Sequence, residues 1–266
     1  MEFLIIFLVI CALLLLKFNR VIMFVIKYLK HKPFPYNLNK REQLSVDQQN
    51  ALSTGLIITE QNMFCCDSLE SDASNSGKTE QRYHLRNGWG IYSSESAIES
   101  LSSFGSTHKL YDVAIEIYLK VPKEHWQSCI DEQIPDELRQ DILAYCSQLD
   151  NLCKVLLVNK GAEDEDKINQ ILHRGTIAWD LGRLVYIARA GYVAGYINKD
   201  QAWQSINSVF PILKQNFSNL KAFGQSYMLG RAMWSHDDSG IYGLFDIYQQ
   251  CVTSEQSPWI KFPLNN

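Results

Sequence analysis

The side chains best suited to chemistry are charged and aromatic residues in two stretches of the second half of the chain. They are Trp179, Asp180, Arg183, Tyr192, Tyr196, Tyr227, Arg231 and Trp234. Asp180 and Arg183 are three residues apart, a spacing that places both on one face of a helix and lets them pair. Gly182 and Gly230 interrupt two helical patterns, and a close approach of the two helices would explain both glycines. Such an approach would bring Arg231 near Asp180 and several aromatic rings.

Two interpretations of this cluster remain open. In the first, Arg183 and Arg231 line a pocket for an anionic group, because guanidinium groups bind carboxylates and phosphates through paired hydrogen bonds. In the second, Asp180 and the arginines form a buried ion pair that holds two helices in register, while the tryptophans and tyrosines belong to the core. An open concave pocket lined by Trp179, Tyr196 and Arg231 would favour the first interpretation.

Other patterns that could carry chemistry are weak. His236-Asp237-Asp238 is the only place where a histidine is followed by two acidic residues, and consecutive side chains at a helix end point in different directions. We therefore interpret it as a polar loop. GxSxG, P-loop, GxGxxG and HExxH motifs are absent from the sequence. The sequence thus indicates no metal and no cofactor, and it leaves any catalytic residue unknown.

Helical periodicity dominates the chain, and alternating strand patterns are absent. Ser45 and Asn198 are predicted N-caps, and Gln201 stands at the capping-box position after Asn198. The pattern predicts an all-α protein, with a single multi-helix globular domain over residues 45–266. The predicted helices run over about 45–64, 93–104, 110–117, 135–160, 165–190, 198–217 and 218–234.

Two segments are predicted to lack regular structure. Residues 32–44 contain Pro33 and Pro35, each of which disfavours helix in the residue before it, so we expect an extended linker. Residues 67–82 read DSLESDASNSGKTEQR, a polar and serine-rich run without periodicity that predicts a flexible insert. The seven cysteines show no CxxC pair, so we expect reduced and mostly buried thiols.

The N-terminus predicts a membrane anchor helix over residues 1–31. Phe3 to Leu16 reads FLIIFLVICALLLL, fourteen residues without a polar interruption. A helix of that length covers about 21 Å of about 30 Å of hydrocarbon, so a span also needs Lys17 and Arg20 to snorkel and Val21 to Ile26 to extend the helix. A cleaved signal peptide fits poorly because no small-x-small cleavage site follows. A buried core helix would normally show a polar face.

Charge is divided unevenly along the chain. The first 41 residues hold seven Lys or Arg and one acid, a net charge of +6, whereas the rest holds 18 basic and 28 acidic residues, a net charge of −10. The positive-inside rule then predicts a single-pass protein of the cell inner membrane, with the N-terminus outside and the C-terminal domain in the cytoplasm. An acidic domain is a poor candidate for nucleic-acid binding, which needs a surplus of Lys and Arg.

Several segments resemble one known family. Ala178-Trp179-Asp180-Leu181-Gly182-Arg183, followed by Ala188-Arg189-Ala190-Gly191-Tyr192 and Ala194-Gly195-Tyr196-Ile197, is similar to the signature of the domain-of-unknown-function 1266 family, found chiefly in bacteria. Gly88-Trp89-Gly90-Ile91, Tyr227 to Trp234 and Ser257-Pro258-Trp259 fit its pattern in the same order. The resemblance covers about residues 86–262. The family has no established activity, so the resemblance implies no catalytic residue.

Two functions from different classes follow as expectations. The first is a noncatalytic protein-interaction module on the cytoplasmic face of the inner membrane, whose partners are the lipid bilayer and another protein. The second is an enzyme or binding protein for an anionic small molecule, with Asp180, Arg183 and Arg231 in its site. A cavity that reaches these side chains would favour the second function.

Overall fold

The computed structural model describes residues 36–39, 43–69, 77–103, 107–160, 165–235 and 239–264. Residues 36–266 form one compact unit. The predicted anchor over residues 1–31 lies outside the described residues. Within the described ranges, no helix is both long enough and apolar enough to cross a membrane.

The described part of the chain is helical and contains no strand, which confirms the all-α prediction. The elements are α2 (Val46–Ser53), α3 (Leu56–Gln61), α4 (Gly77–Trp89), α5 (Ser94–Ser103), α6 (Thr107–Lys120), the 3₁₀ turn η1 (Lys123–His125), α7 (Trp126–Gln133), α8 (Asp136–Lys160), α9 (Glu165–Leu172), α10 (Ile177–Ala194), α11 (Lys199–Asn216), α12 (Leu220–Trp234), α13 (Ser239–Thr253) and α14 (Pro258–Lys261).

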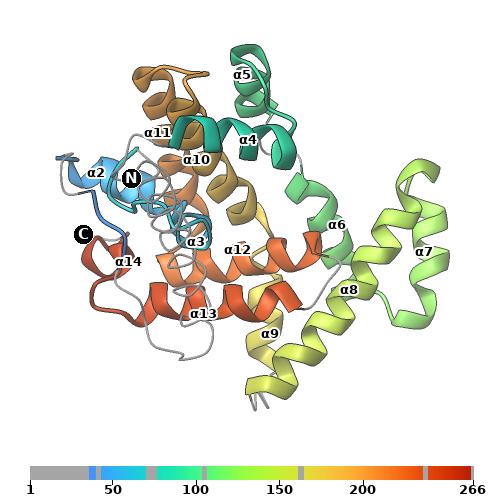
Figure 1. Cartoon of the computed structure of the whole chain (residues 1–266). Coiled ribbons are helices and arrows are strands. Elements are labelled where there is room, and N and C mark those ends of the chain that lie inside the picture. Colours follow the sequence, from blue (N-terminus) through green and yellow to red (C-terminus); the bar gives the residue numbers. More distant parts are fainter. Residues whose placement is uncertain are drawn as a thin grey trace, which may run out of the picture. The chain divides into compact units, whose positions relative to one another are not determined.

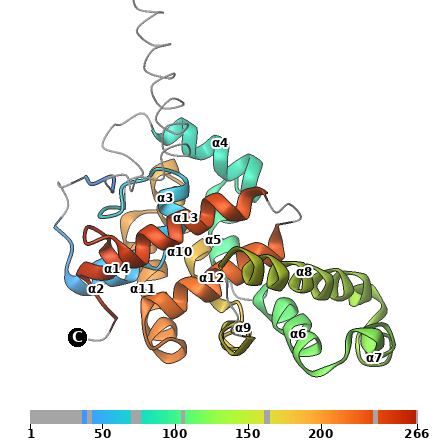
Figure 2. The ribbon, with the colours of Figure 1, turned by 90° about the horizontal axis from the view of Figure 1, so that it is seen from below.

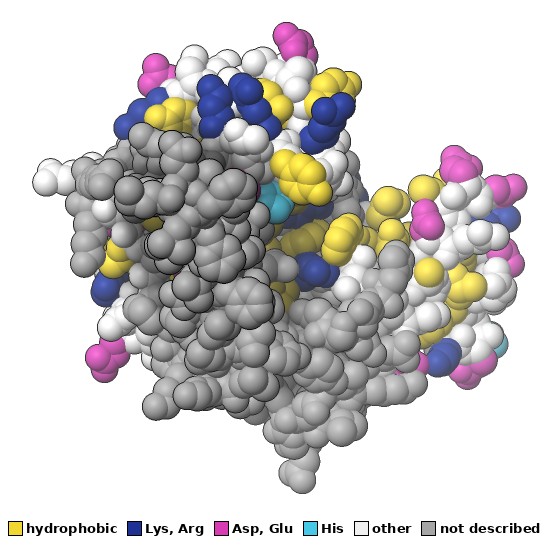
Figure 3. Space-filling view, in the orientation of Figure 1, with side chains coloured by type: hydrophobic (Ala, Val, Ile, Leu, Met, Phe, Trp, Pro, Cys, Tyr) yellow, Lys and Arg dark blue, Asp and Glu magenta, His cyan; other side chains and the backbone are white. Residues whose placement is uncertain are grey.

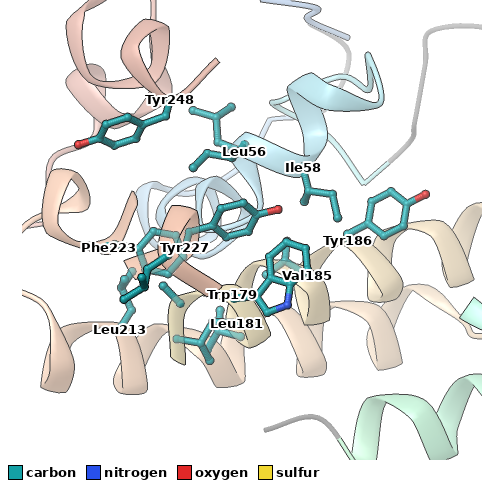
Figure 4. Packing of buried hydrophobic residues seen from close by; sticks show 14 of the residues in the cluster. Leu56, Ile58, Trp179, Leu181, Val185, Tyr186, Leu213, Phe223, Tyr227 and Tyr248 are labelled. Carbon is teal, nitrogen blue, oxygen red and sulfur yellow. The ribbon is translucent and has the colours of Figure 1, made fainter. Parts of the chain in front are cut away.

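Helix α10 is the centre of the bundle. It packs most extensively against α11, α12 and α4, and it also contacts α3, α5 and α6 (Figure 1). Thirteen of its eighteen residues are buried, as expected for a helix that is covered on nearly every side. Figure 4 shows its Trp179 and Val185 packed among Leu56 and Ile58 from α3 and Tyr227 from α12. A side chain on α10 can therefore meet several elements at once.

Helices α6, α7 and α8 form a lobe on one side of the compact unit (Figures 1 and 2). Within the lobe, α8 packs against α6 and α7, and the main contacts with the rest of the unit run from α6 to α10 and from α6 and α8 to α12. Figure 3 shows Asp and Glu side chains around the rim of this lobe, whereas Lys and Arg gather near α4.

Both predicted N-caps are confirmed. The Ser45 hydroxyl accepts from Gln48 N–H, and Gln48 reaches back to the Ser45 N–H, so the two residues form a capping box. Asn198 and Gln201 form the same arrangement at the start of α11. The helix predicted from residue 218 instead begins after Asn219, whose side chain accepts from Ala222 N–H at 2.8 Å.

Two predicted helices are each divided. The helix expected over 45–64 is divided at Thr54 and Gly55. The backbone lies close to α10 at this turn, since a Cβ on Gly55 would lie 2.7 Å from Val185 Cγ1. The helix expected over 165–190 breaks at Gly175, whose φ of +63° is outside the helical range. Helix α10 then runs to Ala194 and ends at Gly195, which has a φ of +75°.

The flexible insert predicted over 67–82 is wrong at both ends. Gly77–Trp89 is helical because Gln81 and Leu85 are buried where α4 packs against α10, and this packing outweighs the polar composition. Residues 67–69 are described and partly buried, with Leu69 only 1% exposed, whereas 70–76 lie outside the described residues.

The linker predicted over 32–44 is wrong for residues 36–39. The Tyr36 side chain is buried, and its hydroxyl donates to Gln250 O at 3.2 Å. Asn39 N–H donates to Asp67 Oδ1 at 2.7 Å. The globular unit therefore begins before residue 45, because this short segment packs on α13 and on the loop after α3.

Candidate functional site

Helices α10 and α12 approach closely at two glycines, as their positions in the sequence predicted. A Cβ on Gly182 would lie 2.6 Å from Tyr227 Cε2. A Cβ on Gly230 would lie 2.5 Å from Trp179 Cβ. Each glycine thus admits an aromatic residue of the opposite helix. Trp179 and Tyr227 consequently meet edge to face, with ring centroids 5.1 Å apart.

A pocket of about 250 Å³ opens beside this contact. Two arginines and four aromatic rings dominate its wall, and two side-chain amides add polar groups. Its lining residues are Ile58, Gln61 and Asn62 from the end of α3, Gly88 and Trp89 from α4, Trp179, Arg183 and Tyr186 from α10, and Arg231 and Trp234 from α12. Four of the eight residues singled out in the sequence line it, namely Trp179, Arg183, Arg231 and Trp234.

The arginines lie over the tryptophan rings. The Arg183 guanidinium carbon is 5.1 Å from the ring centroids of both Trp89 and Trp179. The Arg231 guanidinium carbon is 5.8 Å from the ring of Trp179 and 4.6 Å from that of Trp234. These distances suit cation–π attraction, which keeps a guanidinium flat against a ring. The pocket wall therefore alternates positive and aromatic surfaces.

Asp180 neutralises Arg183 and caps a second helix. Its Oδ1 lies 3.5 Å from Arg183 Nη1, so the predicted pair forms. Its Oδ2 accepts the His108 backbone N–H at 3.1 Å and lies 3.0 Å from His108 Nδ1. His108 stands in the first turn of α6, where unpaired N–H groups need an acceptor. Asp180 is only 2% exposed and is not among the lining residues, so it serves as a structural cap.

A reciprocal cap joins the same two helices. Asp112 from α6 accepts from the backbone N–H of Thr176 at 3.0 Å and from its hydroxyl at 3.1 Å, and Thr176 is the N-cap of α10. Burial raises the pKa of the Asp112 carboxyl, whereas the hydrogen bonds from Thr176 lower it. Helices α6 and α10 thus each supply the carboxylate that satisfies the other's N-terminus.

Three polar atoms around the pocket are buried and have no hydrogen-bond partner within the described part of the chain. They are Trp179 Nε1, Tyr227 Oη and Arg231 Nη1. Burial lowers the pKa of Arg231 and raises that of Tyr227, because the desolvated charged form is disfavoured. Figure 4 shows the Tyr227 ring beside Trp179, with its hydroxyl on the side of Ile58 and Tyr186. An unpaired buried donor costs about 1–3 kcal/mol, so these atoms favour an acceptor from outside the chain.

Tyr192 and Tyr196 lie apart from this pocket. Tyr192 is thirteen residues after Trp179, which corresponds to roughly 20 Å along a helix. Tyr196 follows the end of α10, where Arg82 of α4 stacks on its ring at 5.5 Å. Arg82 also donates to Ala194 O at 2.9 Å and so caps the last turn of α10. Tyr196 therefore belongs to the contact between α10 and α4, whereas Tyr192 packs partly buried against the core.

Sequence reasoning missed the α3 and α4 walls of the pocket. Trp89 had a signal, because Gly88-Trp89 belongs to the pattern that the family resemblance drew on. Nothing in the sequence marked Ile58, Gln61 and Asn62 as pocket residues, because all three lie within the single helix predicted over residues 45–64.

Arg189 holds that α3 wall in place from inside the core. It is 1% exposed and donates to Thr59 Oγ1 at 2.7 Å, to Ser68 O at 2.7 Å and to Cys65 O. Burial lowers its pKa to about 10, which leaves it charged at neutral pH. Because Thr59 stands on α3 and the two carbonyls on the loop behind it, Arg189 ties both to α10.

The described residues contain no grouped metal ligands, and most of their cysteines are buried. No three His, Cys, Asp or Glu side chains gather there closely enough to hold a metal ion. Five of the six described cysteines are buried, which agrees with the prediction for them, and burial raises the pKa of the Cys66 thiol to about 12. His236-Asp237-Asp238 lies outside the described residues.

Comparison with known proteins identifies a family. No curated protein matches the chain, and no solved structure matches it. The family model described as "Protein of unknown function (DUF1266)" matches residues 84–264. This range contains α10, α12 and the α4 end of the pocket, and it agrees closely with the resemblance seen over residues 86–262. The chain therefore belongs to the DUF1266 family.

Proposed function

We propose that this protein binds a small anionic molecule in the pocket between α3, α4, α10 and α12, as a noncatalytic module. The observation that carries the proposal is that two residues lining the pocket, Trp179 and Arg231, have buried donors (Nε1 and Nη1) without a hydrogen-bond partner among the described residues. Folded proteins rarely leave such groups unsatisfied, and concave sites with a few convergent polar groups are the usual places for ligands. A negatively charged acceptor in the pocket would meet the Arg231 guanidinium, which lines it.

A direct binding measurement tests this proposal. We expect small carboxylates or phosphates to bind the 266-residue chain by isothermal titration calorimetry and to raise its unfolding midpoint. A ligand at a hundred times its dissociation constant stabilises the folded state by about 2.7 kcal/mol. The Arg231→Ala variant should lose most of this binding, because no described carboxylate competes for the guanidinium.

Arg139→Ala is the matched control. Arg139 lies on α8 in the lobe and pairs with Asp136 at 2.8 Å, and it does not line the pocket. Its removal costs one positive charge elsewhere on the protein and should leave anion binding unchanged. Equal binding by the native chain and Arg231→Ala, or no anion binding at all, would reject the proposal.

The membrane setting is a second part of the proposal. Residues 1–31 would anchor the chain in the cell inner membrane, with the N-terminus outside and the acidic domain in the cytoplasm. The fourteen-residue apolar run and the net charge of +6 over the first 41 residues support this arrangement. Membrane fractionation combined with protease protection tests it: recovery of the chain in the soluble fraction would contradict the anchor.

An exposed apolar surface favours a protein partner as a second candidate function. Tyr83 on α4, Tyr92 before α5 and Ile98 on α5 are 67%, 66% and 46% exposed. The three residues come from consecutive elements of the chain, and exposed apolar side chains are typical of interaction surfaces where they form a patch. Crosslinking in membranes should capture the same partner repeatedly with the native chain and lose it when Tyr83 and Tyr92 are both replaced by serine. Retention of the partner by that variant would reject this candidate.

A further inference from the structure

We infer that the ligand of this pocket is a small aromatic monocarboxylate, an inference that rests on the proposed anion-binding function. Three properties of the pocket lead to it: its net charge, the ring surfaces on its wall and its volume. Each property restricts a different part of the ligand.

The charge of the pocket matches a single negative charge. Arg183 is already paired with Asp180, whose Oδ1 lies 3.5 Å away. Among the described residues no carboxylate pairs with Arg231, and Arg231 Nη1 is buried without a partner. The site therefore offers one uncompensated positive charge. A carboxylate balances it, whereas a phosphate monoester, which carries close to two charges at neutral pH, leaves excess negative charge in a desolvated site.

The donors that surround this charge suit a carboxylate. A carboxylate is planar and accepts up to about four hydrogen bonds through two oxygens. A guanidinium presents donors in the same plane, and one such pair can be bidentate. Gln61 and Asn62 also line the pocket, and the Asn62 amide already donates to Ile58 O at 2.8 Å, so Gln61 supplies the amide open to a ligand. The Arg231 guanidinium is therefore the group that receives the acid.

The wall surfaces favour a flat ring for the rest of the ligand. Trp89, Trp179, Tyr186 and Trp234 all line the cavity. Trp179 is buried at 5% exposure, whereas Trp234, with ring centroids 6.2 Å away, is 52% exposed. An exposed indole beside a buried one leaves ring surface open to an incoming molecule. Aromatic rings add offset-stacked and edge-to-face attraction to the burial of apolar area, which an aliphatic chain does not supply.

The volume limits the ligand to about one ring and a short acidic arm. A cavity of about 150 Å³ is known to hold benzene, and drug-sized ligands occupy about 300–1,000 Å³. The pocket lies between these limits at about 250 Å³. Phenylacetate has this size and carries the single charge, so it serves as the probe.

Four probes test the preferences for one negative charge and for an aromatic ring by isothermal titration calorimetry at pH 7.5 with the 266-residue chain. Phenylacetate carries the ring and one charge, phenylacetamide lacks the charge, cyclohexylacetate lacks the aromatic ring, and phenyl phosphate carries close to two charges. We expect phenylacetate to bind tightest, with phenylacetamide about ten- to a hundredfold weaker because it loses the charge-assisted hydrogen bonds. Cyclohexylacetate and phenyl phosphate should each bind at least about fivefold more weakly than phenylacetate.

Two variants assign these preferences to side chains. Arg231→Ala should reduce phenylacetate binding to the level of phenylacetamide. Trp234→Leu should weaken phenylacetate more than cyclohexylacetate, because both acids lose the indole that holds the Arg231 guanidinium and only phenylacetate also loses a ring–ring contact. Tyr92→Leu, which replaces another exposed aromatic residue outside the pocket, is the control and should change the binding of neither acid.

The outcomes separate this inference from the proposed function. If cyclohexylacetate or phenyl phosphate binds as tightly as phenylacetate, and Arg231→Ala abolishes that binding, the inferred ligand class is wrong. The proposed anion-binding function would still hold. Equal binding of phenylacetate and phenylacetamide overturns both. Absence of Arg231-dependent binding by all four probes also overturns both.

Discussion

Replacing Gly230 by alanine adds one methyl group at the closest point between α10 and α12. The new Cβ would lie 2.5 Å from Trp179 Cβ, 3.0 Å from Trp179 Cγ and 3.2 Å from Thr176 Cβ. Carbon atoms pack best at about 3.5–4.0 Å, so the overlap with Trp179 Cβ is about 1 Å. A Cβ is fixed to its backbone, and no change of rotamer moves it. The two helices must therefore separate.

The expected loss of stability follows from two opposing terms. Overpacking a core costs about 1–3 kcal/mol, and an overlap of this size between fixed atoms belongs at the upper limit. Alanine favours the helix over glycine by about 1 kcal/mol. The free energy of unfolding should therefore fall by about 2 kcal/mol. For a domain of this size, this loss lowers the unfolding midpoint by about 4–8 °C.

Thermal and urea unfolding of the 266-residue chain measure this loss, and Gly88→Ala is the control. Gly88 is also helical, but a Cβ there has no atom within 4 Å, so its replacement should leave stability unchanged or raise it by up to about 1 kcal/mol. If Gly230→Ala proves as stable as Gly88→Ala, the close approach of α10 and α12 is wrong. The shape of the pocket, which depends on the same approach of α10 and α12, would then be wrong as well.

The remaining predictions concern buried polar groups and thiols. Arg189→Met removes the donors to a threonine hydroxyl and two loop carbonyls, so the free energy of unfolding should fall by at least about 2 kcal/mol. The free energy of unfolding of Arg189→Lys should lie between those of the native chain and Arg189→Met. Asp180→Ala should lower the free energy of unfolding by about 1–2 kcal/mol. Asp180→Asn should lower it less, because an amide oxygen can still accept from the His108 N–H. Equal losses for the two variants in urea unfolding would contradict the capping role of Asp180. Iodoacetamide at pH 8 should modify Cys129 before the buried thiols, including Cys66 with its pKa of about 12, and early labelling of Cys66 in peptide mass maps would refute that order.

Local signals predicted the parts of the fold that depend on neighbours in sequence. The N-cap at Ser45 and the capping box of Asn198 with Gln201 were predicted correctly because caps depend on residues close together in sequence. The pairing of Asp180 with Arg183 was readable for the same reason. The glycines at 182 and 230 pointed to a helix contact because glycine is costly inside a helix.

Contacts between distant segments could not be read in this way. Asp180 meets His108 across 72 residues, and Asp112 meets Thr176 across 64, so no local pattern announces either cap. Helix α4 looked disordered because its composition is polar, and only its burial against α10 keeps it helical. The pocket could not be predicted for the same reason, because its α3 wall and its α10 and α12 walls come from segments that are far apart in the sequence.

The reciprocal caps between α6 and α10 have a consequence for how the protein opens. Each carboxylate is satisfied by the other helix, so separating the two helices exposes both N-termini at once rather than in succession. The lobe of α6, α7 and α8 should therefore detach as one cooperative unit, with hydrogen-exchange protection that is similar for the His108 and Thr176 amides. Because Trp179 and Arg183 follow Thr176 on α10, a bound ligand would slow exchange in α6, more than sixty residues earlier in the chain.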